Sequence, residues 1–336
     1  MRKIFGLDIG TSTIKLVQLQ KSGPKWQLVA AGITTAPPKG MASDAEPDLN
    51  EVAVAVKKLV AQTRPTTKEV AVALPDAQVS SQLVTLPYLS ENELTAAIPW
   101  EAEQYLPIPL EEAEVRHQVV FADKDQNKTQ VLLVAAPKML VQKYSQVLES
   151  AGLSLVAAET ELMALSRVVT PPSKTVVLVD FGASSTNIGI IWHSQLIFTR
   201  SIPTAGEALT RAISSTLSLD PHQAEEYKKA YGLSRKQLEG KVKQALQPIF
   251  MVITEEIRKA IAHYQTQMAG GQIHLIVLSG GTAGLPEAAP TLAQSLGIEV
   301  VVGNPLSQIE PSTQSQALAG YEPLYAIAVG LAQKEV

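Results

Sequence analysis

The feature that most constrains the fold is a short pattern that occurs twice in the chain. Residues 3–13 read KIFGLDIGTST, and residues 175–186 read TVVLVDFGASST. Each copy is an apolar run typical of a buried strand, followed by Asp-x-Gly and then by small hydroxyl side chains. A repeated pattern indicates a repeated architecture, so the sequence predicts two α/β units of similar plan.

The segments that follow each copy come in the same order. After the first copy, the apolar spacing predicts strands and one helix, with strands at 14–19, 26–33 and 69–74 and the helix at 48–62. After the second copy, it predicts strands at 187–192, 195–201 and 273–278 and a helix at 206–217. We therefore expect two domains that face each other, with a ligand site in the cleft between them.

A different kind of segment lies between the two copies. It contains predicted strands at 115–121 and 130–135 and a helix at 139–150. Ser90 and Glu93 form a capping-box pattern at the start of another helix, in which Pro99 predicts a kink or a division into two pieces. This segment is expected to be an inserted α+β module.

The composition excludes several classes of protein. The chain of 336 residues carries 28 Lys and Arg against 32 Asp and Glu, which disfavours a nucleic-acid-binding protein. It has no cysteine, which excludes disulfides, thiolate zinc sites and a cysteine nucleophile. No stretch approaches the ~20 apolar residues that span a bilayer, so we expect a soluble, cytoplasmic protein without direct membrane insertion.

The two Asp-x-Gly turns predict a clamp for a polyphosphate. Each turn offers backbone N–H groups and hydroxyls to phosphate oxygens, and Asp8 and Asp180 are placed to hold Mg²⁺, mainly through its water. Lys15, seven residues after Asp8, is a candidate phosphate ligand, and the alternative is an ordinary solvated lysine. The alternative for both turns is that they only join two strands.

A third candidate element is the glycine-rich turn at Gly280 and Gly281, between a predicted strand and a helix at 286–296. Glycines there allow the backbone to pass close to a flat ring or a sugar. A glycine turn alone is weak evidence, but it gains weight beside two phosphate turns.

Together, the three motifs resemble the phosphate 1, phosphate 2 and adenosine motifs of the actin, Hsp70 and sugar kinase superfamily. The segments LPYLSENEL, PWEAEQYLP and LLVAAPK narrow this to a resemblance to the PilM family of type IV pilus assembly proteins, relatives of the bacterial division protein FtsA. The resemblance implies an α/β, actin-like (ribonuclease H-like) fold with duplicated domains and a 1C-type inserted subdomain. It implies domain 1A at 1–82, 156–172 and 311–336, subdomain 1C at 83–155, and the second domain at 173–310 with a 2B lobe at about 205–270.

The resemblance also implies ATP and Mg²⁺ as cofactors and a set of site residues. The phosphate ligands are Gly10, Thr11, Ser12, Thr13, Lys15, Gly182, Ala183 and Ser184, and the adenosine turn is Gly280 and Gly281. Glu207, Glu225 and Lys228 resemble residues that contact ribose and adenine, and the alternative for them is a solvated helix face. Glu161 resembles the residue that holds the attacking water, and the alternative is a carboxylate without catalytic consequence.

Finally, the resemblance implies a partner. PilM-like proteins bind the cytoplasmic N-terminal tail of the inner-membrane protein PilN, which implies a groove around Leu83 to Leu110 and recruitment to the inner face of the inner membrane. The expected role is an assembly scaffold between a pilus or secretion platform and a cytoplasmic motor, with a weak ATPase activity left open. Two alternatives remain at this point, a small-molecule kinase and an FtsA-like filament-forming division protein.

Overall fold

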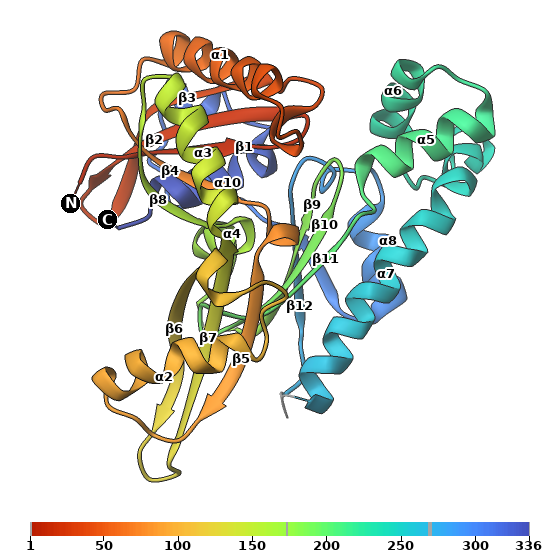
Figure 1. Ribbon diagram of the computed structural model, residues 1–336. Coiled ribbons are helices and arrows are strands. Elements are labelled where there is room, and N and C mark those ends of the chain that lie inside the picture. Colours follow the sequence, from red (N-terminus) through yellow and green to blue (C-terminus); the bar gives the residue numbers. More distant parts are fainter. Residues whose placement is uncertain (1, 173, 268–270, 336) are drawn as a thin grey trace.

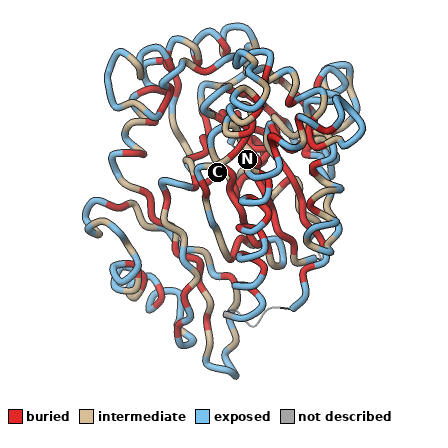
Figure 2. The backbone as a smooth tube through the Cα atoms, turned by 90° about the vertical axis from the view of Figure 1, so that its right-hand side faces the viewer, coloured by how far each residue is buried: buried red, intermediate tan, exposed pale blue. Residues whose placement is uncertain are grey.

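The computed structural model describes residues 2–172, 174–267 and 271–335. The expected domain limits at residues 1, 173, 270 and 336 lie outside these residues. Two five-stranded sheets form the centre of the molecule, one beside α1 and the other beside α7 (Figure 1). Buried residues are concentrated in the strands at the centre (Figure 2).

The two sheets have the same strand order, β3-β2-β1-β4-β8 and β11-β10-β9-β12-β13. In each sheet the first three strands in this order pair antiparallel to one another. The third, fourth and fifth strands pair in parallel. The predicted duplication is thereby confirmed. The first sheet contains β1 Phe5–Ile9, β2 Thr13–Ser22, β3 Lys25–Thr35, β4 Glu69–Leu74 and β8 Ser154–Thr160. The second contains β9 Val176–Phe181, β10 Thr186–Trp192, β11 Gln195–Ile202, β12 Leu275–Ser279 and β13 Glu299–Val302.

Helices cover both faces of the first sheet, which explains why its central strand β1 is buried along its whole length. On one face lie α1 Glu46–Thr63 and α3 Lys138–Ser150. On the other face, α10 Glu322–Ala332 packs against β1 and β2 and against α4 Glu161–Val169, which also contacts the second sheet. A Cβ atom at Gly330 of α10 would overlap the carbonyl oxygen of Ala164, so glycine allows the two helices to approach this closely.

The inserted module is a three-stranded sheet with one helix on it. The strand order is β5-β7-β6, with bounds β5 Ser80–Leu86, β6 Ala113–Asp123 and β7 Lys128–Pro137. Helix α2 Glu91–Glu103 packs its buried Leu94 and Ile98 on this sheet. Two short 3-10 helices, η2 Asp76–Gln78 and η3 Leu110–Glu112, flank the module.

The start of α2 confirms the capping box, because the Ser90 side chain accepts the backbone N–H of Glu93 while the Glu93 carboxylate accepts that of Ser90. The expectation of a two-piece helix at Pro99 is wrong. The helix continues through Pro99 to Glu103, held by the apolar stripe that Ile98 and Ala102 bury on both sides of the proline.

The insert also packs on the second half of the molecule. Phe121 of β6 and Trp192 of β10 make an edge-to-face contact with ring centroids 6.4 Å apart. Strand β5 lies beside β11, the edge strand of the second sheet. The insert therefore contacts both halves that carry the repeated turns.

A helical lobe stands at the far side of the second sheet (Figure 1). It contains α5 Gly206–Leu217, α6 Pro221–Tyr231 and α7 Lys241–Gln267, and α6 starts as expected at Asp220, whose side chain caps it. Two smaller helices complete the chain, α8 Ala288–Leu296 and α9 Thr313–Gln316. Within the residues described, no helix combines the length and the apolar character that crossing a bilayer requires.

Candidate functional site

Both Asp-x-Gly patterns fold into the same tight turn at the end of a strand. The backbone N–H of Gly10 donates to the carbonyl oxygen of Thr13 at 3.1 Å. In the second copy, the N–H of Gly182 donates to Ser185 at 3.1 Å. A Cβ atom at Gly182 would lie 2.9 Å from the Ser185 oxygen, so glycine allows this turn to close.

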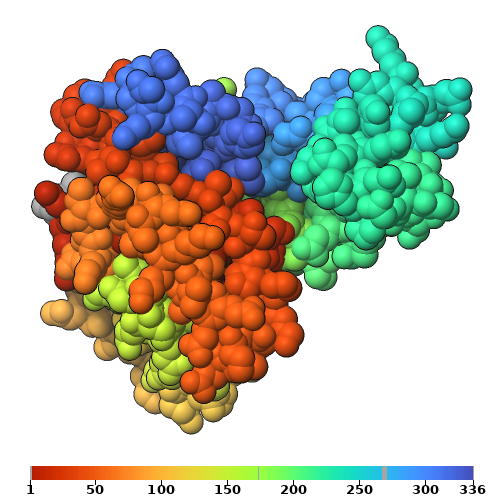
Figure 3. All heavy atoms as spheres, turned by 90° about the horizontal axis from the view of Figure 1, so that it is seen from above, coloured from red at the N-terminus to blue at the C-terminus, as the bar shows by residue number. Residues whose placement is uncertain are grey.

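The two turns face each other. The Ser184 hydroxyl donates to Thr11 Oγ1 at 3.3 Å, although 173 positions separate the two residues in the chain. Thr11, Ser12 and Ser184 are exposed at this point, and Ala183 is partly buried. Seen from above, the α5–α6 lobe stands apart from the side of α1, with the surface hollowed between them (Figure 3). Exposed backbone and hydroxyl groups from both halves therefore meet in one place, which is an arrangement that binds anions.

Behind the first turn lies a buried ion pair. Lys15 Nζ is 2.9 Å from Asp8 Oδ2, and only 10% of the lysine side chain and 4% of the aspartate side chain are exposed. The two residues are direct partners in the β1–β2 register. The solvated-lysine alternative is therefore wrong for Lys15, whose charge lies inside the site and stabilises a buried carboxylate.

The second turn has an equivalent pair that the sequence analysis missed. Asn187 is the register partner of Asp180 and lies seven residues after it, as Lys15 lies seven residues after Asp8. Its Nδ2 is 3.4 Å from Asp180 Oδ2, and its Oδ1 accepts the hydroxyl of Ser201 at 2.6 Å. The equal spacing in the two copies was the signal that could have identified it.

Glu161, the first residue of α4, belongs to this cluster. Its Oε2 accepts Asn187 Nδ2 at 2.9 Å. Burial raises the pKa of Glu161 well above its usual value, and the neighbouring charges of Asp180, Asp76 and Asp8 raise it further. The structure thus places the predicted water-holding carboxylate against the second turn.

Asp76, in η2 after β4, is a further member that sequence reasoning missed. The backbone N–H of Leu162 donates to Asp76 Oδ2 at 2.9 Å, and the N–H of Asp76 itself lies 3.4 Å from Glu161 Oε2. Asp76 is 8% exposed, and its Oδ1 has no hydrogen-bond partner among the residues described. In the sequence it reads as an ordinary Pro-Asp turn, so no local signal indicates its burial.

Burial dominates the titration of these carboxyl groups. It raises the pKa of Asp76 to about 7, against the hydrogen bond from the Leu162 N–H, which favours the charged form. It raises the pKa of Asp180 to about 6, and the charge of Asp8 adds to this rise while Lys15 opposes it. A cluster of carboxyl groups with raised pKa values in one place is typical of a functional site, because burial without compensation is unfavourable.

Among the residues described, no three His, Asp or Glu side chains converge as direct metal ligands. Asp8 and Asp180 nevertheless lie at the ends of neighbouring turns, where their oxygens can accept hydrogen bonds from the water of a hydrated ion. The magnesium role of these two residues stays a prediction.

The glycine-rich turn is attached to the second Asp-x-Gly turn. Gly280 has φ +87°, and a Cβ atom there would lie 2.5 Å from Asp180 Oδ1, so only glycine fits beside this carboxylate. Next to Gly281, Thr282 donates its N–H to Phe181 O at 2.9 Å and its hydroxyl to Gly182 O at 2.8 Å. Thr282 was missed by the sequence analysis, and its two hydrogen bonds fix the glycine turn to the second Asp-x-Gly turn.

The lobe residues meet the same turn from the other side. Lys228 is buried, and its Nζ donates to the carbonyl oxygen of Gly206 at 3.0 Å and pairs with Glu225 at 2.6 Å. The solvated-face alternative is therefore wrong for Lys228. Glu207 has an exposed side chain, and only its backbone N–H reaches the turn, at Ala183 O.

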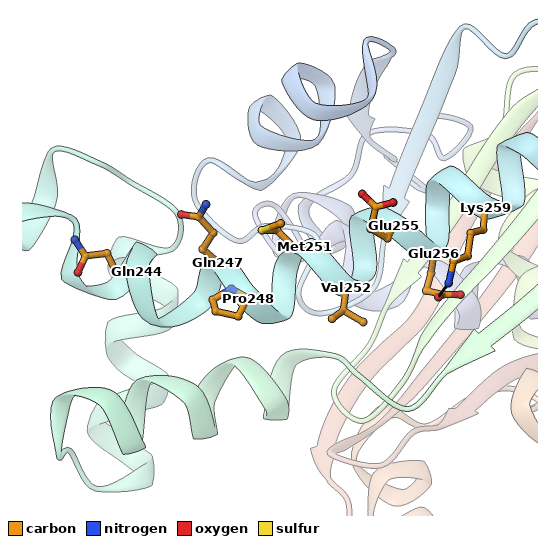
Figure 4. A pocket seen from close by; sticks show the side chains of 8 residues that line it. All are labelled: Gln244, Gln247, Pro248, Met251, Val252, Glu255, Glu256 and Lys259. Atoms are coloured by element: carbon orange, nitrogen blue, oxygen red, sulfur yellow. Dashed lines mark hydrogen bonds and ion pairs between the residues drawn. The ribbon is translucent and has the colours of Figure 1, made fainter.

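Two hollows in the surface lie outside the cluster. A shallow groove of about 700 Å³ runs along one face of α7 (Figure 4) and contains none of the predicted site residues. It is lined by Gln244, Gln247, Pro248, Met251, Val252, Glu255, Glu256 and Lys259. A smaller pocket of about 230 Å³ lies on the insert, lined by Ser80, Ser81, Gln82, Ala102, Tyr105, Leu106, Leu133 and Ala135.

The raised pKa of Asp76 predicts a specific dependence of stability on pH. The folded chain holds a proton on this carboxyl at pH values where the unfolded chain has released it, so this group lowers the free energy of unfolding as pH rises from about 4 towards 7. Asp76→Asn removes this effect, because the amide does not titrate, and it keeps a side-chain oxygen that can accept the Leu162 N–H. We expect the stability of the variant relative to the wild type to rise over this range, by up to roughly 1.4 kcal/mol per pH unit.

Urea unfolding at several pH values measures this difference. Asp125→Asn, at an exposed turn of the insert, is the control and should give a flat difference. A flat difference for Asp76→Asn as well would contradict the raised pKa of this buried carboxyl.

Comparison with known proteins agrees with this geometry. The chain matches the family model of the type IV pilus assembly protein PilM over residues 6–336. The solved PilM-PilN type IV pilus biogenesis complex contains a chain that is 26% identical, with a TM-score of 0.85 and 98% of both chains covered. MreB5 of Spiroplasma citri bound to ADP is 14% identical, with a TM-score of 0.57 over 98% of this chain and 95% of that chain, which shows the actin-like fold alone.

Among curated proteins, the cell division protein FtsA of Streptococcus pneumoniae serotype 2 is 25% identical, covering 88% of this chain and 74% of its own length. FtsA of Bacillus subtilis is 22% identical, covering 97% of this chain and 82% of its own length. The match to the PilM model extends over almost the whole chain, through both sheets, the insert and the facing turns. The chain therefore belongs to the PilM family of type IV pilus assembly proteins.

Proposed function

We propose that this chain is an actin-like, ATP-binding scaffold of type IV pilus assembly, which binds the cytoplasmic N-terminal tail of a PilN-like inner-membrane protein. The observation that carries the nucleotide part is the meeting of two equivalent turns, at Thr11 and Ser184, in front of the buried Asp8 and Asp180. The partner part is supported by the fold shared with the PilM-PilN complex. Recruitment to the inner face of the inner membrane through this partner, and contacts with a pilus or secretion platform and a cytoplasmic motor, belong to the same proposal.

The residues present fit a nucleotide with its magnesium ion. Backbone N–H groups of 11–13 and 183–184 would hold phosphate oxygens, and Lys15 would add a positive charge. Asp8 and Asp180 would hold Mg²⁺ through its water, and the ion would neutralise phosphate charge. The turn at 280–281 would lie against the adenosine, because it leaves backbone without side chains next to the second phosphate turn.

Two features of the site bear on hydrolysis. Glu161 Oε2 already accepts Asn187 Nδ2 at 2.9 Å, and it lies 3.4 Å from the backbone N–H of Asp76. An oxygen engaged in contacts within the protein is poorly placed to accept the proton of a water molecule. We therefore propose that ATP serves mainly to hold the two halves together and that hydrolysis is slow.

The pocket on the insert is the proposed position of the partner tail. It lies between the start of β5, the end of α2 and β7, within or next to the expected segment from Leu83 to Leu110. Tyr105 lines it with 48% of its surface exposed, and Trp100 on α2 is 74% exposed. Exposed aromatic rings beside a pocket are common anchors for a bound peptide.

A charge placed at the facing turns tests the nucleotide site. Ser184→Asp introduces a negative charge where phosphate oxygens would bind, and it leaves the buried residues unchanged. We expect MgATP binding to be weaker by about fivefold or more, because two like charges about 4 Å apart repel by roughly 1–4 kcal/mol. Isothermal calorimetry on the purified chain measures it.

The matched control is Ser194→Asp, at the exposed turn at the opposite end of the same strand β10. It should leave the affinity for MgATP unchanged. Equal affinity in Ser184→Asp and the wild type would remove the second turn from the proposed site.

Two tyrosines of the insert test the partner pocket. Tyr105 and Tyr88 are exposed to similar degrees, 48% and 42%, but only Tyr105 lines the pocket. We expect Tyr105→Ser to weaken binding of a synthetic peptide, copied from the N-terminal tail of the PilN-like protein of the same organism, by about tenfold or more. Tyr88→Ser should change it less than about twofold. Fluorescence anisotropy measures both, and equal losses in the two variants would place the peptide elsewhere.

A further inference from the structure

The turn between β4 and β5 connects the candidate nucleotide site to the insert over a very short length of chain. Strand β4 ends at Leu74, Asp76 contacts the carboxylate cluster, and β5 starts at Ser80. The first residues of β5, Ser80 to Gln82, line the insert pocket. Four positions of chain therefore separate the cluster from the wall of the pocket.

Asp76 holds this turn against the start of α4 by two contacts, one in which its side chain accepts a hydrogen bond and one in which its backbone N–H donates. Its carboxylate accepts the N–H of Leu162 at 2.9 Å, and its own N–H lies 3.4 Å from Glu161 Oε2. The same Glu161 oxygen accepts Asn187 Nδ2 at 2.9 Å, and Asn187 in turn contacts Asp180. A continuous set of polar contacts thus leads from the second phosphate turn to the residue that precedes the insert.

The burial of Asp76 is costly, which argues that it serves more than packing. One of its oxygens has no hydrogen-bond partner among the residues described, and an unsatisfied buried group of this kind costs about 1–3 kcal/mol. An apolar side chain at the same place avoids this cost. On its other side, η2 lies against β11 of the second half, so the turn is held between both halves of the molecule.

We propose that Asp76 is a positioning residue that ties Glu161 to the start of β5, so that occupancy of the nucleotide site changes the wall of the insert pocket. This inference rests on the proposed function and names the route by which its two sites communicate. A displacement of the Glu161 carboxylate alters its contact with the N–H of Asp76. The Asp76 side chain keeps the turn attached to α4, so that the turn moves together with the start of this helix. The segment from Ser80 to Gln82 then moves with the turn.

Hydrogen exchange of the full chain with and without MgATP tests this route. In the wild type, MgATP should slow exchange directly at residues 10–13 and 182–185, and by at least about threefold at residues 80–83. In Asp76→Ala, the direct protection should remain and the change at residues 80–83 should disappear. Asp76→Asn keeps an oxygen that can accept the Leu162 N–H, and it should restore the change at residues 80–83. If Asp76 acted only through its charge, the neutral asparagine would not restore that change.

The control is Asp123→Ala, because Asp123 also stabilises a turn, accepting the N–H groups of Asp125 and Gln126, but at the other end of the insert. It should keep the response at residues 80–83. If Asp76→Ala does not fold, Glu161→Ala removes the other contact between the turn and α4, the one from the backbone N–H of Asp76 to Glu161 Oε2, and must abolish that response.

Three results would overturn the inference. The first is an unchanged response at residues 80–83 in Asp76→Ala or in Glu161→Ala, and the second is a wild type that shows direct protection without that response. The third is no protection at residues 10–13 and 182–185 in the wild type. Only this last result also refutes the proposed nucleotide site, so the two failures are distinguishable.

Discussion

The ion pair between Asp8 and Lys15 and the matching contact between Asp180 and Asn187 are the interactions on which the site depends. Each joins the end of one strand to its neighbour behind a glycine turn, and each places a carboxylate inside the protein. In the first half the register partner of the carboxylate is a lysine, whereas in the second it is an amide. Burial raises the pKa of Asp180, and the nearby charge of Asp8 raises it further.

The same two turns also determine how the rest of the molecule is arranged around them. The glycine turn at Gly280 and the start of α5 at Gly206 both bond to the second turn, and α4 brings Glu161 to it from between the sheets. The insert begins one short turn away and packs through Phe121 on Trp192 of the second half. The glycine turn, α5 and α4 therefore converge on the second turn and on the Asn187 side chain beside it, which suits a protein whose ligand holds its halves together.

Much of this was predictable from the sequence because the signals are local and occur twice. An apolar run followed by Asp-x-Gly gives the same turn in both halves, and the capping box at Ser90 starts a helix wherever it occurs. What the sequence does not show depends on residues that are far apart in the chain. Asp76 is buried only because α4, 85 positions later, lies against it, and Lys228 is buried only because the lobe folds onto Gly206. The division of α2 at Pro99 was wrongly predicted for the same reason, since packing on the sheet keeps the helix in one piece.

The central claim is that a nucleotide binds between the two facing turns. A crystal structure of the chain with Mg²⁺ and a non-hydrolysable ATP analogue tests it most directly. The account predicts a triphosphate bound by the backbone of residues 10–13 and 182–184, with the hydrated ion next to Asp8 and Asp180. A nucleotide bound elsewhere, or a cleft that stays empty at millimolar analogue, would contradict it.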